Sequence, residues 1–210
     1  MSSLPFKAAT AAVGASGAGL GGYGIYHLSL SPKETIRDRI TSSLKNTKKR
    51  FLGKEDSEWS GLESKYAKLS DKPKKANGTT DLSFSEIPSW CDKSASEEYS
   101  DSNKDLYDQV LTFCFFNTNT LLSNTDSGVL KSNQDKSHEE WKAAWDSYQK
   151  TADKESKGLK ITETSVNTDI NNSERDKGGE ALHKWCTETS AKKMYDSEDL
   201  FPIFKHWCVK

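Results

Sequence analysis

Four cysteines in two similarly spaced pairs constrain the fold of this chain more than any other feature of its sequence. The segment SWCDKSASEEYSDSNKDLYDQVLTFC holds Cys91 and Cys114, and the segment KWCTETSAKKMYDSEDLFPIFKHWC holds Cys186 and Cys208. The spacings are 23 residues (114 − 91) and 22 residues (208 − 186), and a Trp precedes the first cysteine of each pair. A chain that repeats such an arrangement is expected to repeat a structural unit.

Aromatic and apolar residues extend this correspondence beyond the cysteines. Trp59 and Tyr66 match residues that lie 82 positions later, and the remaining matches lie 94 or 95 positions later. The order is preserved, and the offset changes only within polar loops, where insertions cost little. We therefore predict two tandem copies of one small helical module, over residues 56–116 and 138–210. The matched core positions are Trp59, Tyr66, Trp90, Leu106 and Phe113 in the first copy and Trp141, Tyr148, Trp185, Leu200 and Trp207 in the second.

The position of each cysteine predicts how it is paired. Each lies on the apolar face of its own expected helix, one near the start of a helix and the other near the end of the next. If these helices pack antiparallel, disulfides Cys91–Cys114 and Cys186–Cys208 form. Each would stabilise its module by roughly 3–4 kcal/mol through the loop that it closes.

Two alternatives to disulfides stay open at this point. Cysteine is often buried in reduced form as a small apolar residue. A metal site in the second copy is the other alternative, because His183 and His206 lie close in sequence to Cys186 and Cys208. The first copy has no histidine near its cysteines, so this alternative would not follow the repeat.

Apolar periodicity predicts an all-α class. Expected helices cover residues 32–51, 56–70, 84–99, 138–156, 176–193 and 197–208, and a further helix begins at Asn103 and carries Cys114 on its apolar face. Ser31 with Glu34, and Ser137 with Glu140, have the spacing of capping boxes. Polar loops are expected at 70–81, 117–136 and 157–175, with a short extended piece at 159–166. Residues 31–55 form the amphipathic basic helical region of this scheme, and 117–137 form a linker between the copies.

The N-terminal region has the composition of a targeting or anchoring segment. After Lys7 there is no charged residue up to Leu30, and the stretch is rich in Ala and Gly. Residues 1–30 are therefore interpreted as a signal peptide or a membrane anchor, with 7–28 contacting the membrane, and a flexible tail is the third possibility.

Charge is distributed unevenly along the chain. Residues 1–50 carry eight Lys or Arg against two acidic residues, and the remainder carries 22 basic against 29 acidic residues, a net charge of −7. An acidic main part argues against nucleic acid as a partner. The seven basic residues within 33–50 favour a cytoplasmic location for the part that follows an anchor, whereas disulfides favour the outside.

Motifs for catalysis are missing from the sequence. It contains no phosphate-binding glycine loop, no H-E-x-x-H and no C-x-x-C. The acidic pairs Glu97-Glu98 and Glu198-Asp199 are typical of solvated helix faces, and Glu139-Glu140 of a helix start. We therefore expect a protein that is not an enzyme and that uses no cofactor or metal.

The Met-Ser start, the segment KAATAAVGASGAGLGGYG and the repeated Trp-Cys…Cys modules together resemble a known group. This group comprises the large paralogous families of small uncharacterised proteins in haemotrophic mycoplasmas. The resemblance implies a membrane-associated or exported protein, displayed at the surface, with a host-cell surface protein as its partner or with a role in antigenic variation. The alternative is a cytoplasmic-facing, membrane-anchored interaction module with reduced cysteines.

Overall fold

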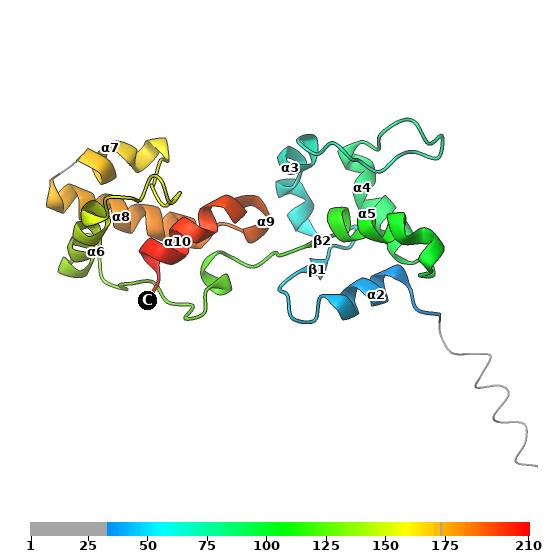
Figure 1. The fold of residues 1–210 in the computed structure, drawn as a ribbon, viewed down its shortest axis with the longest axis horizontal. Helices are drawn as coiled ribbons and strands as arrows, with labels where there is room; N and C mark the ends of the chain where they lie inside the picture. The colour runs from blue at the N-terminus through cyan, green and yellow to red at the C-terminus, as the bar shows by residue number, and fades with distance from the viewer. Residues whose placement is uncertain (1–32, 173) are drawn as a thin grey trace, which may run out of the picture. The chain divides into compact units, whose positions relative to one another are not determined.

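The computed structural model describes residues 33–172 and 174–210, and this part of the chain is mostly helical, as predicted (Figure 1). The predicted signal peptide or anchor, residues 1–30, lies outside the described residues. Two hydrophobic cores organise the structure, one formed mainly by residues 36–116 and the other by residues 121–209.

The first core is enclosed by short helices and one pair of strands. β1 and β2 pair antiparallel, with Phe51 opposite Phe115. Helices α4 and α5 pack against each other, and α2 packs across both. The elements are α2 (Ile36–Ser43), β1 (Arg50–Phe51), η1 (Ser57–Gly61), α3 (Glu63–Ala67), η2 (Phe84–Glu86), α4 (Ile87–Ala95), η3 (Asp101–Asn103), α5 (Lys104–Cys114) and β2 (Phe115–Phe116).

The second core is built around the longest described helix, α8, on which α6, α7 and α10 pack. Apolar residues of α8 recur at near-helical spacing and are buried, among them Leu182 and Trp185. The elements are η4 (Leu122–Asn124), α6 (Glu139–Lys150), α7 (Thr164–Asn172), α8 (Arg175–Ser190), α9 (Met194–Ser197), η5 (Glu198–Leu200) and α10 (Phe201–Cys208).

The first predicted helix, 32–51, is correct only in its middle part. α2 begins after Thr35, whose hydroxyl accepts a hydrogen bond from the Asp38 amide (3.1 Å) while the Asp38 carboxylate accepts one from the Thr35 amide (3.3 Å). The cap is therefore Thr35 rather than Ser31. The helix ends at Ser43 because the chain turns back and Phe51 joins β1, where pairing with Phe115 replaces helical hydrogen bonds.

The start of the expected helix at 138 is also capped differently. His138, rather than Ser137, is the N-cap, and its Nδ1 accepts a hydrogen bond from the Glu140 amide (3.3 Å). The Ser137 hydroxyl donates instead to the Asp135 carboxylate (2.6 Å). The predicted helix 56–70 is likewise divided into η1 and α3.

Two of the three predicted loops have more structure than expected. Residues 117–137 are not an independent linker, because Leu121 and Ser132 are buried and the Leu121 amide donates to the Lys192 carbonyl (2.8 Å). The region 157–175 contains helix α7 rather than an extended piece. Val166 and Ile170, four residues apart, are both buried against the second core.

Candidate functional site

Both predicted disulfides are present. In each core the second cysteine is the last residue of its helix, α5 or α10, and the first cysteine lies within α4 or α8. Cys91 is bonded to Cys114 with a Cα–Cα distance of 5.6 Å, and Cys186 to Cys208 with 5.4 Å. All four cysteines are fully buried. The chain therefore has neither reduced core cysteines nor cysteine ligands for a metal, and no cluster of three or more His, Cys, Asp or Glu suited to a metal occurs in the described ranges.

The two histidines of the alternative metal site pack on aromatic rings. The His183 ring lies edge-on to Trp141 (centroids 5.1 Å apart), and the His206 ring lies edge-on to Trp207 (4.3 Å). Burial lowers the pKa of His183, against the opposing effect of Asp135.

Most of the predicted core positions are buried. Trp90, Leu106 and Leu200 are half-buried at the edges of their cores. The buried positions are Trp59, Tyr66 and Phe113 in the first core and Trp141, Tyr148, Trp185 and Trp207 in the second.

Corresponding positions in the two cores make corresponding contacts. Tyr66 meets Phe113 edge-on at 6.0 Å, and Tyr148 meets Trp207 edge-on at 4.9 Å. The indole of Trp59 donates to the carbonyl of residue 53 (2.8 Å), and that of Trp141 donates to the carbonyl of residue 134 (3.2 Å). In both cores an aromatic ring is thus fixed to the segment that precedes its helix.

The backbone around the second cysteine of each pair also behaves alike. The Cys114 carbonyl accepts from the Leu52 amide (2.8 Å), and the Cys208 carbonyl accepts from the Lys131 amide (2.7 Å). The residue that follows this cysteine forms an antiparallel pair with an earlier residue of the chain. Phe115 pairs with Phe51 in the first core, and Val209 pairs with Leu130 in the second. In each core, the residue after the second cysteine is thus joined to a segment from earlier in the chain.

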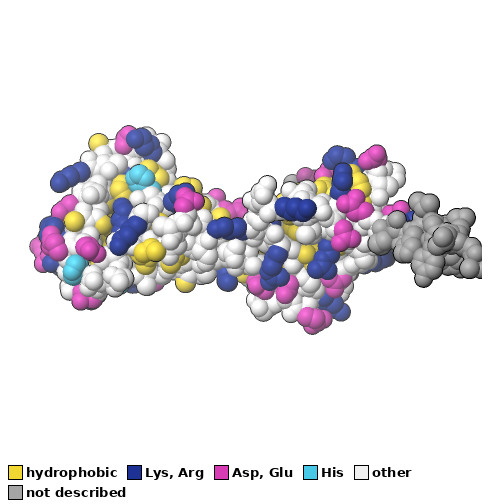
Figure 2. All heavy atoms as spheres, turned by 90° about the horizontal axis from the view of Figure 1, so that it is seen from below, with side chains coloured by type: hydrophobic (Ala, Val, Ile, Leu, Met, Phe, Trp, Pro, Cys, Tyr) yellow, Lys and Arg dark blue, Asp and Glu magenta, His cyan; other side chains and the backbone are white. Residues whose placement is uncertain are grey.

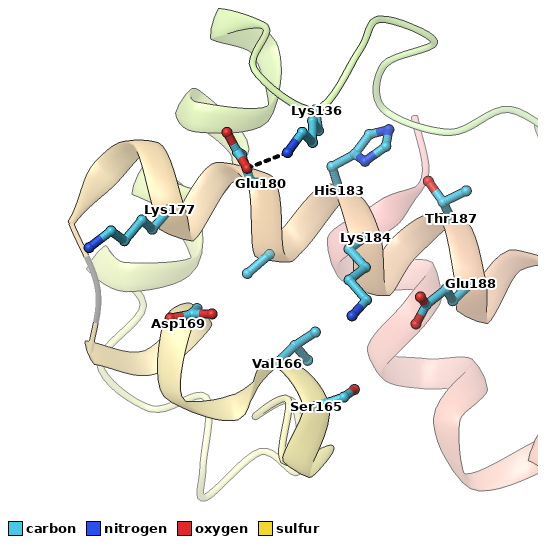
Figure 3. A pocket seen from close by; sticks show the side chains of 11 residues that line it. Lys136, Ser165, Val166, Asp169, Lys177, Glu180, His183, Lys184, Thr187 and Glu188 are labelled. Atoms are coloured by element: carbon cyan, nitrogen blue, oxygen red, sulfur yellow. Dashed lines mark hydrogen bonds and ion pairs between the residues drawn. The ribbon is translucent and has the colours of Figure 1, made fainter.

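One surface groove lies between α7 and α8 and has a volume of about 460 Å³ (Figure 3). Val166 and Ser165 of α7 face it from one side, and α8 supplies most of the other wall. The Lys136 ammonium is already paired with the Glu180 carboxylate at 2.8 Å. Lys177, Lys184, Asp169 and Glu188 complete its charged lining. Because both signs of charge are interspersed, this groove favours no ligand of a single charge.

A second groove, of about 550 Å³, has a lining of one sign of charge. We call it the basic groove. Among the described residues that line it, the charged ones are Arg37, Lys45, Lys49 and Arg50, and none is acidic. Leu44, Phe51 and Phe115 form its apolar part, and Thr41 and Thr47 contribute hydroxyl groups.

Two of these cations are held in place by the surrounding structure. The Arg37 guanidinium lies 4.3 Å from the centroid of the Phe51 ring. Arg50 donates to the carboxylates of Asp56 and Glu58, both at 2.8 Å. The hydrogen bond from Arg50 is the main cause that lowers the pKa of the Asp56 carboxyl.

The sequence indicated a basic segment but not this concave site. A single helix over 32–51 would have distributed its Lys and Arg side chains around the whole helix surface. The turn after Ser43 and the return of the chain through β1 instead bring Lys45 and Lys49 beside Arg37. The run KNTKKR, with two weak helix formers between its cations, was the available signal for that turn.

Within the described residues, no helix has both the length and the apolar character needed to cross a bilayer. Residues 7–28 lie outside the described residues, so their predicted contact with a membrane stays a prediction. Comparison of the chain with protein-family models, with curated proteins and with solved structures finds no match.

Proposed function

We propose that this protein is a non-enzymatic binding protein, held at a membrane by residues 7–28 or exported, whose folded part lies outside the cytoplasm. The pairing of all four cysteines in two buried disulfides is the observation that carries this proposal. Disulfides of this structural kind form and persist in oxidising surroundings and are rare in the cytosol.

The folded part, in this proposal, consists of two copies of one helical module. Its support is the set of corresponding contacts in the two cores, namely the disulfide, the edge-on aromatic pair, the indole hydrogen bond and the backbone closure. The closure includes residues 50–52 and 129–131. We therefore place the modules at about 50–116 and 129–210, which shifts the predicted starts at 56 and 138 towards the N-terminus.

The proposed biological role is contact with a host-cell surface protein or antigenic variation. The resemblance to the mycoplasma families supports this role, as does the exposed loop over 74–81, which carries few core contacts. Loops outside a covalently closed core can change in sequence without loss of the fold.

The decisive experiment is a non-reducing peptide map, with prior thiol blocking, of protein isolated from its native cells. Linked peptides that join Cys91 to Cys114 and Cys186 to Cys208 are expected. Protease treatment of intact cells, followed by the same map, is expected to remove the folded part. Four blocked thiols in a protein that resists the protease would overturn the proposal.

A second candidate has one observation in its favour. The basic residues within 33–50 would, beside an anchor, favour a cytoplasmic location. The protein would then be a cytoplasmic-facing interaction module, and the same two measurements separate it from the first candidate.

A further inference from the structure

We propose that the basic groove binds the phosphate of anionic phospholipid headgroups, so that the folded part docks onto the membrane surface through Arg37, Lys45, Lys49 and Arg50. This inference rests on the proposed function in that it takes the membrane at residues 7–28 to be the surface that is bound.

The donors of the groove suit a phosphate. Arg and Lys side chains give charge-assisted hydrogen bonds to phosphate oxygens, and Arg can give two in parallel. The hydroxyl of Thr41 lines the same groove and adds a neutral donor. Leu44, which is half-buried, can meet the glycerol region beside a headgroup, whereas Phe51 and Phe115 are buried and form the floor of the groove.

Three of the four cations of the groove are available to a ligand. In the described part of the chain, Arg37, Lys45 and Lys49 form no ion pair with a carboxylate, whereas Arg50 is held by Asp56 and Glu58. Figure 2 views the chain from the side of α2 and shows Asp and Glu side chains among the Lys and Arg side chains of this face. The groove is therefore a local concentration of positive charge on a mixed surface.

A membrane is favoured over nucleic acid by the rest of the chain. Residues 51–210 carry a net charge of −7 (22 basic and 29 acidic residues), which would repel a long polyanion that extends beyond the groove. A headgroup is a short ligand and meets only the local charge. Moreover, only seven residues separate Leu28, the end of the proposed membrane segment, from the start of α2 at Ile36. Eight peptide links reach at most about 28 Å, so the groove lies on a short tether from a bilayer at residues 7–28.

The test measures co-sedimentation of the full chain with vesicles of phosphatidylcholine, with and without phosphatidylglycerol, at fixed ionic strength. The test variant is Lys45→Gln/Lys49→Gln. The matched control, Lys93→Gln/Lys150→Gln, removes the same charge from two exposed lysines outside the groove. The readout is the gain in affinity when phosphatidylglycerol is included. This gain is separate from any binding to phosphatidylcholine alone, which reports on residues 7–28.

We expect the gain in affinity to be roughly 25-fold smaller for the test variant, because each charge removed near a membrane surface lowers the affinity about fivefold. The control variant should keep the full gain. Equal gains for both variants would overturn the proposal. The proposal would also be overturned if millimolar inorganic phosphate abolished the gain, because the groove would then be a site for free phosphate. Tighter binding of a single-stranded oligonucleotide through the same two lysines would overturn it as well. If the chain does not bind vesicles of phosphatidylcholine alone, this result counts against the anchor at residues 7–28. The gain with phosphatidylglycerol would still measure binding by the basic groove.

Discussion

The indole of Trp145 lies directly on the backbone of α8 at Gly178, where a methyl group would overlap the ring. The indole N–H donates to the carbonyl of Ile170 in α7 (2.9 Å), so the ring cannot easily move aside. Trp145 thus connects α6, α7 and α8 at one point, and the absence of a side chain at Gly178 makes this possible.

Gly178→Ala is expected to lower the free energy of unfolding by up to about 2 kcal/mol. Alanine inside a helix gains about 1 kcal/mol over glycine, but overpacking a fixed ring costs about 1–3 kcal/mol or more. Urea unfolding measures the difference. Gly53→Ala is the control, because its new methyl group would meet only an Asp56 oxygen at 3.9 Å. A stabilised Gly178→Ala variant would show that the ring does not lie where the structure has it.

Removal of either disulfide is expected to lower the free energy of unfolding by about 3 kcal/mol. The variants are Cys91→Ala/Cys114→Ala and Cys186→Ala/Cys208→Ala, whose loops are of nearly equal length (sequence separations of 23 and 22). The two losses should therefore be similar. Denaturant unfolding without reductant provides the comparison, and a loss confined to one pair would contradict the proposal that the chain contains two equivalent modules.

Tyr148→Phe is expected to cost about 1–3 kcal/mol, because the Ile161 amide would be left buried without its partner. The Tyr148 hydroxyl accepts from this amide (3.2 Å) and donates to Asn171 (2.6 Å). Tyr107→Phe is the matched control, since the partner of its hydroxyl among the described residues is the exposed Ser43 hydroxyl at 3.3 Å. Thermal or urea unfolding of the two variants should differ accordingly, and equal stability would count against the buried hydrogen bond.

The capping box at the start of η2 predicts a pH dependence. The side-chain hydrogen bond from Ser83, together with its amide and Lys75, lowers the pKa of Glu86 from 4.5 to about 2. Because the folded pKa is depressed, the stabilisation is present above pH 4.5 and is lost as the pH falls towards 2. An NMR titration of the Glu86 carboxyl carbon measures this pKa directly. Ser83→Ala should raise it, and an unchanged value would contradict the capping box.

The helical class and the cysteine pairing were predictable because both depend on local periodicity. Cys91 and Cys114 lie on the apolar faces of consecutive helices, and in antiparallel packing such positions face each other. The same periodicity identified Trp141 and Tyr148, which are fully buried.

The misplaced boundaries have a different physical origin. The end of α2 is set by the pairing of Phe51 with Phe115, a partner 64 residues away (115 − 51), and no local pattern reports such a contact. Helix α7 was missed because only Val166 and Ile170 are apolar within a polar stretch, so its apolar face is narrow. The basic groove depends on that same return of the chain, and hence it could not be derived from the charges alone.

The common closure of each core determines how the protein would respond to mechanical force. A force that pulls residues 50 and 116 apart would break the hydrogen bonds of the short β1–β2 pair one after another, starting from the end at which the force acts. The segment between residues 52 and 91 could then lengthen, but the segment between Cys91 and Cys114 could not, because the disulfide carries the load past it. The second core has the same design at Leu130, Val209 and its own disulfide. Each core would thus open at its strand pairing under a small force, and its disulfide would limit how far the chain extends. The disulfide-linked helices, α4 with α5 or α8 with α10, would stay joined under tension.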